Sequence, residues 1–350
     1  MHAILADDLS GATEIAGVAS RSGTDVIVCL DLPKQRPEAD TVVIDSNTRL
    51  LSPGESETRV TRICQSIRSW DTASFFKKVD SILRGPVTAE IEAIMKSLGQ
   101  KRAILASANP SMGRFIRKGH YLINSVPLEK TSFAQDPHHP RQCSEVRKLI
   151  DDHPHILTPD VDSMKNLEAI ARSLEQEDLP VGASDFYLAW SGAPEFRPPA
   201  LSPGKRLWVL GSRAGSDLKG RKPQGFPVPF PESNSFSSSQ LDEWTARSMA
   251  HAANTNSMVL SVPSKPGNPR VITENLTKAA HRLVKEWHPD QVFLAGGATA
   301  RAFVEFAGWK SLRVEAELAQ GIVMLRPEGQ EDAPALVIKP GSYPWPELDY

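Results

Sequence analysis

The stretch MHAILADDLSGATEIAG, residues 1–17, decides the fold because it joins a strand, a polar turn and a helix. Its apolar run, His2–Ala6, predicts a strand, and a helical pattern follows at Ala12–Ser22. Asp7 and Asp8 therefore stand where the strand ends, and Gly11 stands where the helix begins. In open α/β sheets, ligands bind at the carboxyl ends of the strands. We therefore expect this turn to belong to a binding site.

Two interpretations of the aspartate pair are open. Aspartates at a strand end accept hydrogen bonds from substrate hydroxyls, help to hold Mg²⁺ or take a proton from an attacking alcohol. An Asp just before a helix can instead cap the first turn. One Asp suffices for a cap, so Asp7 and Asp8 followed by Gly11 favour a functional role.

The same alternation continues through the first half of the chain. We predict strands at His2–Ala6, Asp25–Leu30, Thr41–Asp45, Ser74–Val79 and Arg102–Ala106, with helices near Ala12–Ser22, Glu55–Ser69 and Val87–Leu98. Strands separated by helical patterns of this length indicate a parallel sheet with helices on both faces. Periodicity fails from Ala108 to about Pro140, where we expect a long loop, and helical patterns resume at Ser144–Asp151 and Val161–Glu175.

A Pro- and Ser-rich stretch, Ala193–Gly204, divides the chain. Beyond it we predict strands at Arg206–Leu210, Met258–Val262 and Gln291–Leu294, helices at Leu241–Ala253, Ile272–Trp287 and Thr299–Ala307, a surface loop over residues 221–239 and a strand-rich tail. The fold class is therefore α/β. We expect two α/β domains, residues 1–195 and 205–350, each with a largely parallel sheet flanked by helices, and a cleft between them.

The composition narrows the classes of partner. Forty basic against forty-two acidic residues leave a formal charge of −2, which gives no reason to expect nucleic acid or a membrane surface as partner. No run reaches the length of a transmembrane helix, and the N-terminus shows no signal-peptide pattern. The three cysteines stand far apart, so neither a disulfide framework nor a zinc site is expected. We expect a cytoplasmic protein without metal-ligating side chains, and a homodimer is left open.

Two further strand ends carry polar residues. KKVDSILRGP, residues 77–86, follows an apolar strand and supplies Lys78, Asp80, Ser81 and Arg84, while IDSNTRL, residues 44–50, adds Asp45, Ser46 and Arg49. One such turn is ordinary, because its charges can simply pair with one another at the surface. A carboxylate ligand needs a cation, preferably Arg, and polyol hydroxyls need mixed donors and acceptors. Three polar strand ends at one sheet edge therefore indicate a pocket for a small, anionic, hydroxylated ligand.

The expected long loop contributes further candidates. Gly113, Arg114 and Gly119 with His120 are placed to wrap a ligand or to close over it. His138 and His139 are flanked by prolines, which disfavours a helical pair of metal ligands. We expect these two histidines to lie in a rigid surface turn.

Glycine turns in the second half are candidates for binding phosphate through backbone N–H groups. They are VLGSRAGS (209–216), FLAGGATARAF (293–303) and IKPGSY (338–343). A GG turn between a strand and a helix is also common in tight βα geometry. No GxxxxGK[ST] or GxGxxG motif is present, so neither a P-loop enzyme nor a standard dinucleotide fold is supported.

Taken in this order, the segments resemble the four-carbon acid sugar kinase family. The motifs that carry the resemblance are ADDLSGA (6–12), KKVDSILRGP (77–86), GRFIRKGHYLINSVPLEKTSFAQDPHHP (113–140), GSRAG (211–215), GGATA (296–300) and KPGSY (339–343). The family usually has an acidic residue where Ala298 stands. Its tail is GGFG-like, whereas Pro344 here removes a backbone donor.

The resemblance implies an N-terminal sugar-acid-binding domain and a C-terminal nucleotide-binding domain. It implies a kinase that uses ATP and Mg²⁺ to phosphorylate the terminal hydroxyl of a threonate, erythronate or 3-oxo-tetronate type acid. The residues that it assigns to the substrate are Asp8, Arg49, Lys78, Asp80, Ser81 and Arg84, to which position in the chain adds Asp7 and Arg114. Those assigned to ATP are Ser212, Gly296, Gly297, Thr299 and Gly341, with Ala298 in the same turn.

We hypothesise that Arg84 or Arg49 binds the substrate carboxylate, while Asp8 and Asp80 hold hydroxyls and one of them, Asp8 first, is the catalytic base. Two other classes of protein stay open. A non-catalytic sugar-acid sensor would keep the first pocket and a degenerate nucleotide site, which Ala298 and Pro344 favour. An α/β enzyme of other chemistry, such as an aldolase or a hydrolase, has no GxSxG or HExxH motif to support it.

Overall fold

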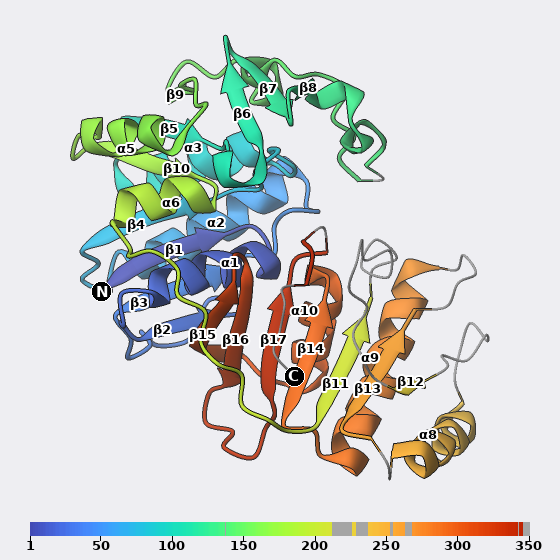
Figure 1. The fold of residues 1–350 in the computed structure, drawn as a ribbon. Coiled ribbons are helices and arrows are strands. Elements are labelled where there is room, and N and C mark those ends of the chain that lie inside the picture. Colours follow the sequence, from blue (N-terminus) through green and yellow to red (C-terminus); the bar gives the residue numbers. More distant parts are fainter. Residues whose placement is uncertain are drawn as a thin grey trace. The chain divides into compact units, whose positions relative to one another are not determined.

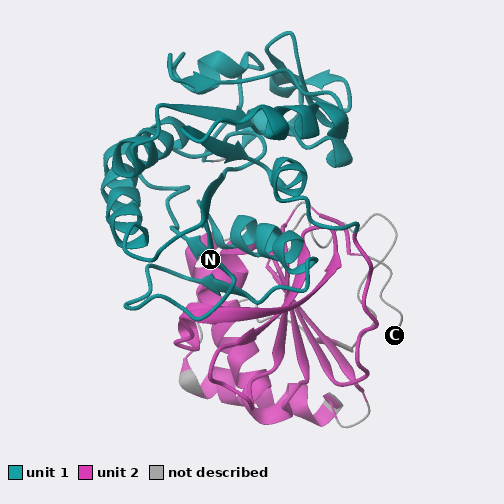
Figure 2. Cartoon of the chain, turned by 90° about the vertical axis from the view of Figure 1, so that its left-hand side faces the viewer, with its two compact units in different colours: residues 1–195 teal, residues 196–350 magenta. Residues whose placement is uncertain are grey.

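The computed structural model describes residues 1–136, 138–211, 226–228, 237–252, 255–262, 268–341 and 343–345. The chain divides into two compact units, Met1–Glu195 and Phe196–Tyr350 (Figure 2). Both units contain β-strands flanked by α-helices (Figure 1). The division falls within the Pro- and Ser-rich stretch of residues 193–204.

Unit 1 is built on a parallel sheet. In spatial order its strands are β2 (Val26–Cys29), β3 (Thr41–Asp45), β1 (His2–Ala6), β4 (Ser74–Lys78), β10 (Asp178–Gly182), β5 (Arg102–Ala106) and β9 (Ile156–Leu157). Each neighbouring pair runs parallel. The central strands are buried along almost their whole length, as expected when helices cover both faces. The predicted α/β class is therefore confirmed.

The helices of unit 1 form two groups. In one, α6 (Ser184–Ser191) packs against both α1 (Leu9–Ser20) and α5 (Met164–Ser173), and in the other α2 (Pro53–Ile67) packs against α3 (Val87–Leu98). Because the strands are buried on both sides, the two groups cover opposite faces of the sheet. The start of α2 is fixed by a capping box between Ser52 and Glu55. A short helix, α4 (Val146–Leu149), lies farther along the chain.

The segment predicted to be a structureless loop contains regular structure, so that expectation was wrong. It forms an antiparallel sheet of β6 (Arg114–Arg117), β7 (His120–Ile123) and β8 (Val126–Pro127), with the 3₁₀ helices η1 (Pro110–Met112), η2 (Leu128–Lys130) and η3 (Ser132–Gln135). These strands are too short to show a period of two in the sequence. The strand β10 was also missed, because its sequence DLPVG carries Pro180 and Gly182, which are disfavoured inside strands.

Unit 2 has a second, largely parallel sheet. Its spatial order is β12 (Phe226–Val228), β13 (Ser257–Ser261), β11 (Arg206–Leu210), β14 (Gln291–Ala295), β17 (Ala335–Lys339), β16 (Ile322–Pro327) and β15 (Ser311–Ala319). The strands from β12 to β17 pair in parallel, whereas β15, β16 and β17 pair antiparallel and form the expected strand-rich tail. The helices are α8 (Ser238–Ala252), α9 (Pro269–Trp287) and α10 (Gly297–Phe306). Most of the predicted surface loop, 221–239, lies outside the described residues.

Aromatic packing holds the centre of unit 2. Trp208 of β11 stacks on Phe293 of β14 with ring centroids 4.0 Å apart. Trp345 meets Trp208 edge-on at 4.9 Å and belongs to the same buried cluster. Tight packing of this kind fixes the position of the tail beyond β17.

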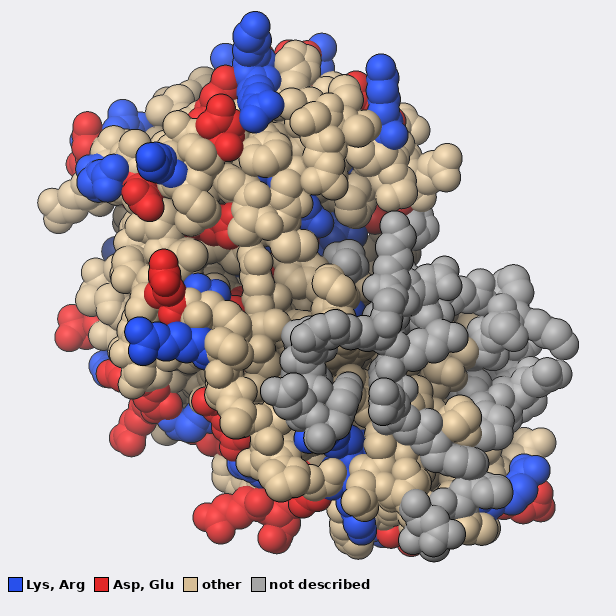
Figure 3. All heavy atoms as spheres, viewed as in Figure 1, with Lys and Arg blue, Asp and Glu red and all other residues tan. Residues whose placement is uncertain are grey.

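Charged side chains of both signs are interspersed over the visible face of the described residues (Figure 3), in keeping with the near-zero formal charge. Among those residues, we found no helix with the length and apolar character that a membrane crossing requires.

Candidate functional site

The carboxyl ends of the central strands of unit 1 are level with one another. Ala6 of β1 pairs with Asp45 of β3 and with Lys78 of β4. Gly182 of β10 pairs with Lys78 and with Ala106 of β5. The polar turns that follow these strands therefore meet at one edge of the sheet, as the sequence analysis expects.

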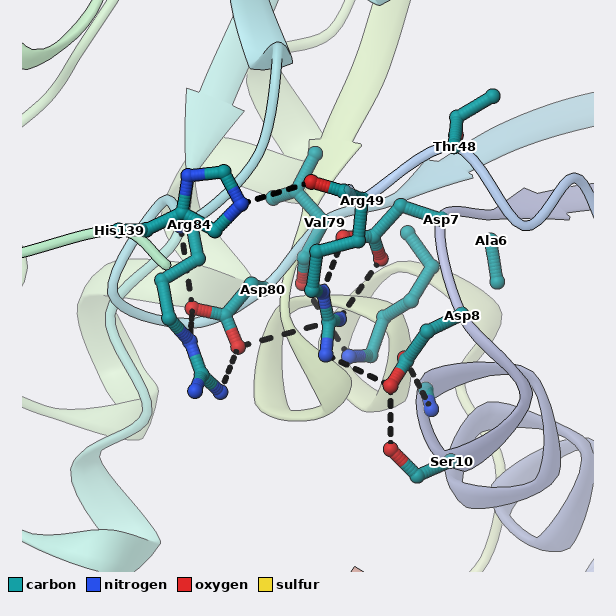
Figure 4. Close-up of polar contacts among 12 residues, drawn as sticks. Ala6, Asp7, Asp8, Ser10, Thr48, Arg49, Val79, Asp80, Arg84 and His139 are labelled. Atoms are coloured by element: carbon teal, nitrogen blue, oxygen red, sulfur yellow. Dashed lines mark hydrogen bonds and ion pairs between the residues drawn. The ribbon is translucent and has the colours of Figure 1, made fainter. Parts of the chain in front are cut away.

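Arg49 binds the aspartate pair that follows β1 (Figure 4). Its Nε and Nη2 donate to the two carboxylate oxygens of Asp7 at 2.7 and 3.0 Å, and its Nη1 donates to Asp8 Oδ2 at 2.6 Å. Asp8 is also the N-cap of α1, because its Oδ1 accepts the Gly11 N–H at 2.8 Å. The Asp8 side chain is 20% exposed and that of Asp7 only 3%. Asp8 therefore caps the helix and still presents a carboxylate that a ligand can reach.

Arg84 organises a second group of ion pairs. Its Nε and Nη2 donate to the Asp80 carboxylate at 3.0 and 2.8 Å, and its Nη1 donates to Asp136 Oδ2 at 3.1 Å. Asp80 also accepts two backbone N–H groups of its own turn. Arg49 Nη2 lies 3.9 Å from Asp80 Oδ1, so the two groups form one connected array (Figure 4).

These contacts keep Asp7 and Asp80 ionised. Burial raises the pKa of Asp7, but the charge and hydrogen bonds of Arg49 outweigh it, and the pKa lies below its ordinary value. Burial likewise raises the pKa of Asp80, while the Arg84 and Arg49 charges hold it well below its usual range. Burial opposes the charge of both arginines, yet the carboxylates raise their pKa values. The site is therefore a fixed array of charges at neutral pH.

Lys78 lies beside this array and is held by a residue that the sequence analysis missed. Its Nζ is 3.0 Å from Glu14 Oε2, and both side chains are buried. Ser184 Oγ donates to Glu14 Oε1 at 3.0 Å, and Asn109 Nδ2 donates to Ser184 Oγ at 3.3 Å. A methyl group added at Gly11 would lie 3.5 Å from Lys78 Nζ. The signal was available, since Glu14 is the one charged residue in the helical run Leu9–Ser20.

Ser81 and Arg114 contact each other, although they are 33 residues apart. Arg114 Nη1 donates to Ser81 Oγ, and its guanidinium carbon lies 5.8 Å from the centroid of the Phe133 ring. The nearby Tyr121 hydroxyl is buried without a hydrogen-bond partner in the described structure. Burial raises the pKa of Tyr121, and the charges of Arg114 and Asp80 also act on it. Arg114, Ser81 and Asp80 therefore lie in one polar neighbourhood.

The two histidines of the long segment behave differently from each other. His138 is exposed, as expected for a surface turn. The ring of His139 is half-buried, and its Nε2 lies 2.8 Å from the carbonyl oxygen of Arg49 (Figure 4). Asp136 Oδ1 accepts the N–H groups of both histidines at 3.0 and 2.9 Å. The expectation of a simple surface turn was wrong for His139, because its ring packs against the polar edge of the sheet.

In unit 2, the glycine turn after β14 opens α10. Gly296 is the N-cap, with a φ of 103° that favours glycine, and no side chain caps this helix. Gly297 begins the helix, and Ala298 is exposed in its first turn. Thr299 is buried and lies so close to Gly211, at the end of β11, that a methyl group on Gly211 would overlap its side chain. The ends of β11 and β14 are thus in contact here.

The end of β17 adds a lysine that the sequence analysis missed. Lys339 is buried, and its Nζ donates to the carbonyl oxygens of Pro340 at 2.9 Å and Tyr343 at 2.6 Å, across the turn that contains Gly341. Burial lowers the pKa of Lys339 to about 8. The backbone oxygen of Lys339 accepts the N–H of Gly296 at 2.9 Å, so the tail and the glycine turn are joined. Ser212 lies outside the described residues.

A separate cavity of about 700 Å³ lies elsewhere in unit 1, with Arg102, His153 and Asp178 among its lining residues. Arg102 and Asp178 are the first residues of β5 and β10 and bind each other. This cavity is therefore at the amino ends of the strands. Because ligands of open α/β sheets bind at the carboxyl ends, we assign the candidate site to the polar edge.

Comparison with known families matches both halves of the chain. Residues 2–184 match a family described as the sugar-binding N-terminal domain, which covers more than half of the chain. Residues 238–343 match a family described as the nucleotide-binding C-terminal domain.

Three proteins with similar sequences are named as kinases of four-carbon acids. D-erythronate kinase of Heliobacterium modesticaldum is 34% identical over 152 residues, which are 42% of this chain and 35% of that protein. D-threonate kinase of Salmonella typhimurium is 31% identical over 153 residues, with the same two shares. 3-oxo-tetronate kinase of Burkholderia multivorans is 23% identical over 292 residues, 81% of this chain and 62% of that protein. The matched region thus spans about a third of the first two relatives.

Solved structures share the fold at low sequence identity. Haemophilus influenzae protein HI1011 has a TM-score of 0.73 at 18% identity, and the match covers 97% of this chain and 96% of that chain. A crystal structure from Salmonella typhimurium LT2 reaches 0.80 at 17% identity, with the same coverage. The two matched domains and the named relatives show that the chain belongs to the four-carbon acid sugar kinase family.

Proposed function

We propose that the chain is an ATP-dependent kinase that phosphorylates the terminal hydroxyl of a four-carbon acid of the threonate, erythronate or 3-oxo-tetronate type. The observation that carries this proposal is the meeting of Asp8, Lys78 and Asp80 at one edge of the unit 1 sheet. Fixed carboxylates and cations side by side suit a ligand that carries both hydroxyls and a carboxylate. The names of the relatives supply the reaction class.

Asp8 is our choice for the catalytic base. Its side chain is 20% exposed, compared with 3% for Asp7 and 8% for Asp80, so it is the one that best meets a substrate hydroxyl. In this role Asp8 accepts the hydroxyl proton as the oxygen attacks the γ-phosphorus of ATP, the bond from that phosphorus to the bridging oxygen breaks, and ADP leaves. Both oxygens of Asp7 are engaged by Arg49, and we assign Asp7 to positioning that guanidinium.

The nucleotide would be held in unit 2 by Gly296, Gly297, Thr299 and Gly341, with Ser212. The first turn of α10 suits a phosphate, because its N–H groups have no side-chain cap and point toward the helix N-terminus. The described residues contain no group of three or more His, Cys, Asp or Glu side chains that could hold a metal ion. We therefore derive no step through Mg²⁺, and its requirement stays a prediction, as do the homodimer and the cytoplasmic location.

ATP consumption in the presence of D-threonate, D-erythronate or 3-oxo-tetronate tests the activity. We expect one of these acids to stimulate turnover, and Asp8→Asn to lower kcat by roughly 10²–10⁴-fold, the usual contribution of a general base. Asp31→Asn is a matched control, because Asp31 is an exposed carboxylate that also faces an arginine, Arg62. Turnover near the wild-type rate in Asp8→Asn would remove Asp8 from the base role. Absence of stimulation by every acid would contradict the kinase proposal.

One observation favours a second candidate, a sugar-acid sensor without catalysis. Ala298 is exposed in the first turn of α10, which has no acidic residue. Calorimetry separates the two candidates, because a sensor binds a four-carbon acid without binding ATP, whereas a kinase binds both.

A further inference from the structure

Carboxylates and guanidiniums are paired at the polar edge of unit 1. Four carboxylates meet there, and they are those of Asp7, Asp8, Asp80 and Asp136, which we call the aspartate cluster. Arg49 binds two of them and Arg84 binds the other two. Both guanidiniums are thus engaged by carboxylates of the protein. The carboxylate of a ligand must therefore displace one of these aspartates or meet another cation.

Arg141 is a cation whose charge is not matched in this way. Its Nη2 donates to the carbonyl oxygen of Leu83 at 2.7 Å, and its Nε is buried with no hydrogen-bond partner in the described structure. No carboxylate of the described residues approaches Arg141 within ion-pair distance. Its contact with the carbonyl oxygen of Leu83, the residue before Arg84, places it beside the aspartate cluster, and burial lowers its pKa.

The backbone around Arg141 is fixed in place. Its N–H donates to the carbonyl oxygen of Phe133 at 2.9 Å, and the neighbouring His139 ring contacts the carbonyl oxygen of Arg49. Asp136, at the start of the same segment, is bound by Arg84. The segment is thus attached to the turns after β3 and β4, and the guanidinium is presented without a large loss of backbone entropy on binding.

We propose that Arg141, and not Arg49 or Arg84, receives the carboxylate of the sugar acid. The proposal rests on the function proposed above and replaces the sequence-based hypothesis that Arg84 or Arg49 binds the carboxylate. Arg49 and Arg84 then hold the aspartates that contact the hydroxyls, and Arg141 distinguishes an acid from a neutral polyol. Arg114 also has no carboxylate partner among the described residues, but its guanidinium donates to the Ser81 hydroxyl and lies against the Phe133 ring, whereas Arg141 Nε is left without a hydrogen-bond partner.

Calorimetric titration of the intact chain with D-threonate, D-erythronate and their neutral amides tests the proposal. For Arg141→Gln we expect the affinity for the acid to fall roughly 10- to 100-fold, as for loss of a hydrogen bond to a charged group, with little change for the amide. Arg141→Lys should restore part of the preference for the acid. Arg59→Gln is the matched control, since Arg59 also donates to turn carbonyls, those of Ser46 and Asn47, and should keep the preference.

Three results would overturn the proposal in different ways. If the wild-type chain binds the acids but Arg141→Gln loses acid and amide affinity equally, or loses neither, Arg141 only supports the Leu83 turn. If Arg141→Gln does not fold, an unchanged preference in Arg141→Lys, which retains a cation but loses the guanidinium fork, would count against a specific carboxylate contact. If neither acid binds to the wild-type chain, the proposed function fails first and this inference falls with it.

Discussion

The substitution Gly11→Ala, at the turn after β1, should weaken binding of the acid and leave the free energy of unfolding nearly unchanged. A methyl group at this position would lie 2.9 Å from Asp8 Oδ1, closer than side chains normally approach, and 3.8 Å from Asp7 Oδ1. The Asp8 carboxylate cannot move away cheaply, because Gly11 N, Ser10 Oγ and Arg49 Nη1 all donate to it. The substitution must therefore displace the carboxylate that we assign to the substrate hydroxyl.

Gly11→Ala has two opposing effects on the free energy of unfolding. Alanine in place of glycine in a helix contributes about 1 kcal/mol of stability, and partial loss of the Asp8 cap costs about the same. We expect the free energy of unfolding to change by less than about 1 kcal/mol. Loss of a hydrogen bond to a charged group is worth about 1.5–3 kcal/mol, so the affinity for a four-carbon acid should fall at least tenfold.

Urea unfolding and calorimetric titration of the same preparations measure both quantities. Gly54→Ala is a matched control, because Gly54 lies in the first turn of α2 with no atom within 4 Å of the added methyl group. It should gain up to about 1 kcal/mol of stability and bind the acid as the wild type does. An affinity of Gly11→Ala within about twofold of wild type, at normal stability, would refute the assignment of Asp8 to the substrate.

Three further predictions concern the charges of unit 1. Asp80→Asn should lower the free energy of unfolding by roughly 3 kcal/mol in urea titration, because it leaves Arg84 with one carboxylate; a change near zero would contradict it. Lys77→Met should lower the free energy of unfolding by roughly 3–5 kcal/mol, because the buried Glu90 Oε2, 2.5 Å from Lys77 Nζ, loses its cation. The double variant Lys77→Met with Glu90→Leu should recover most of this loss. The pKa values of Asp7 and Asp80 are lower in the folded chain than in the unfolded chain, where they are about 3.9, so ionisation of these groups stabilises the fold above that pH. This stability is lost as the pH falls below about 3.9. Urea midpoints that stay constant down to a pH of about 2 would contradict the prediction.

The alternation of strands and helices was predictable because it depends on long, regular patterns. The strands β1, β3 and β5 and the helix α3 have the bounds that hydrophobic patterning predicts. The polar edge was predictable for a related reason. Parallel strands end at the same edge, and residues far apart in the sequence, such as Asp8 and Asp80, follow such ends.

What escaped prediction depends on tertiary contacts. The pairing of Lys78 with Glu14 requires α1 to pack beside β4, which no local pattern specifies. Arg141 reaches the Leu83 carbonyl only because Asp136 and His139 are bound to the turns after β4 and β3. The resemblance favoured Asp8 over Asp7, but the physical reason is tertiary: Arg49 donates two hydrogen bonds to the buried Asp7 and one to the more exposed Asp8.

A crystal structure of the intact chain with bound D-erythronate or D-threonate tests the central claim most directly. The claim predicts the acid at the carboxyl ends of β1 and β4, with a hydroxyl oxygen within hydrogen-bond distance of Asp8 and another polar atom near Lys78. The acid seated elsewhere, for example in the cavity beside Arg102, with Asp8 and Lys78 making no contact to it, would contradict the account.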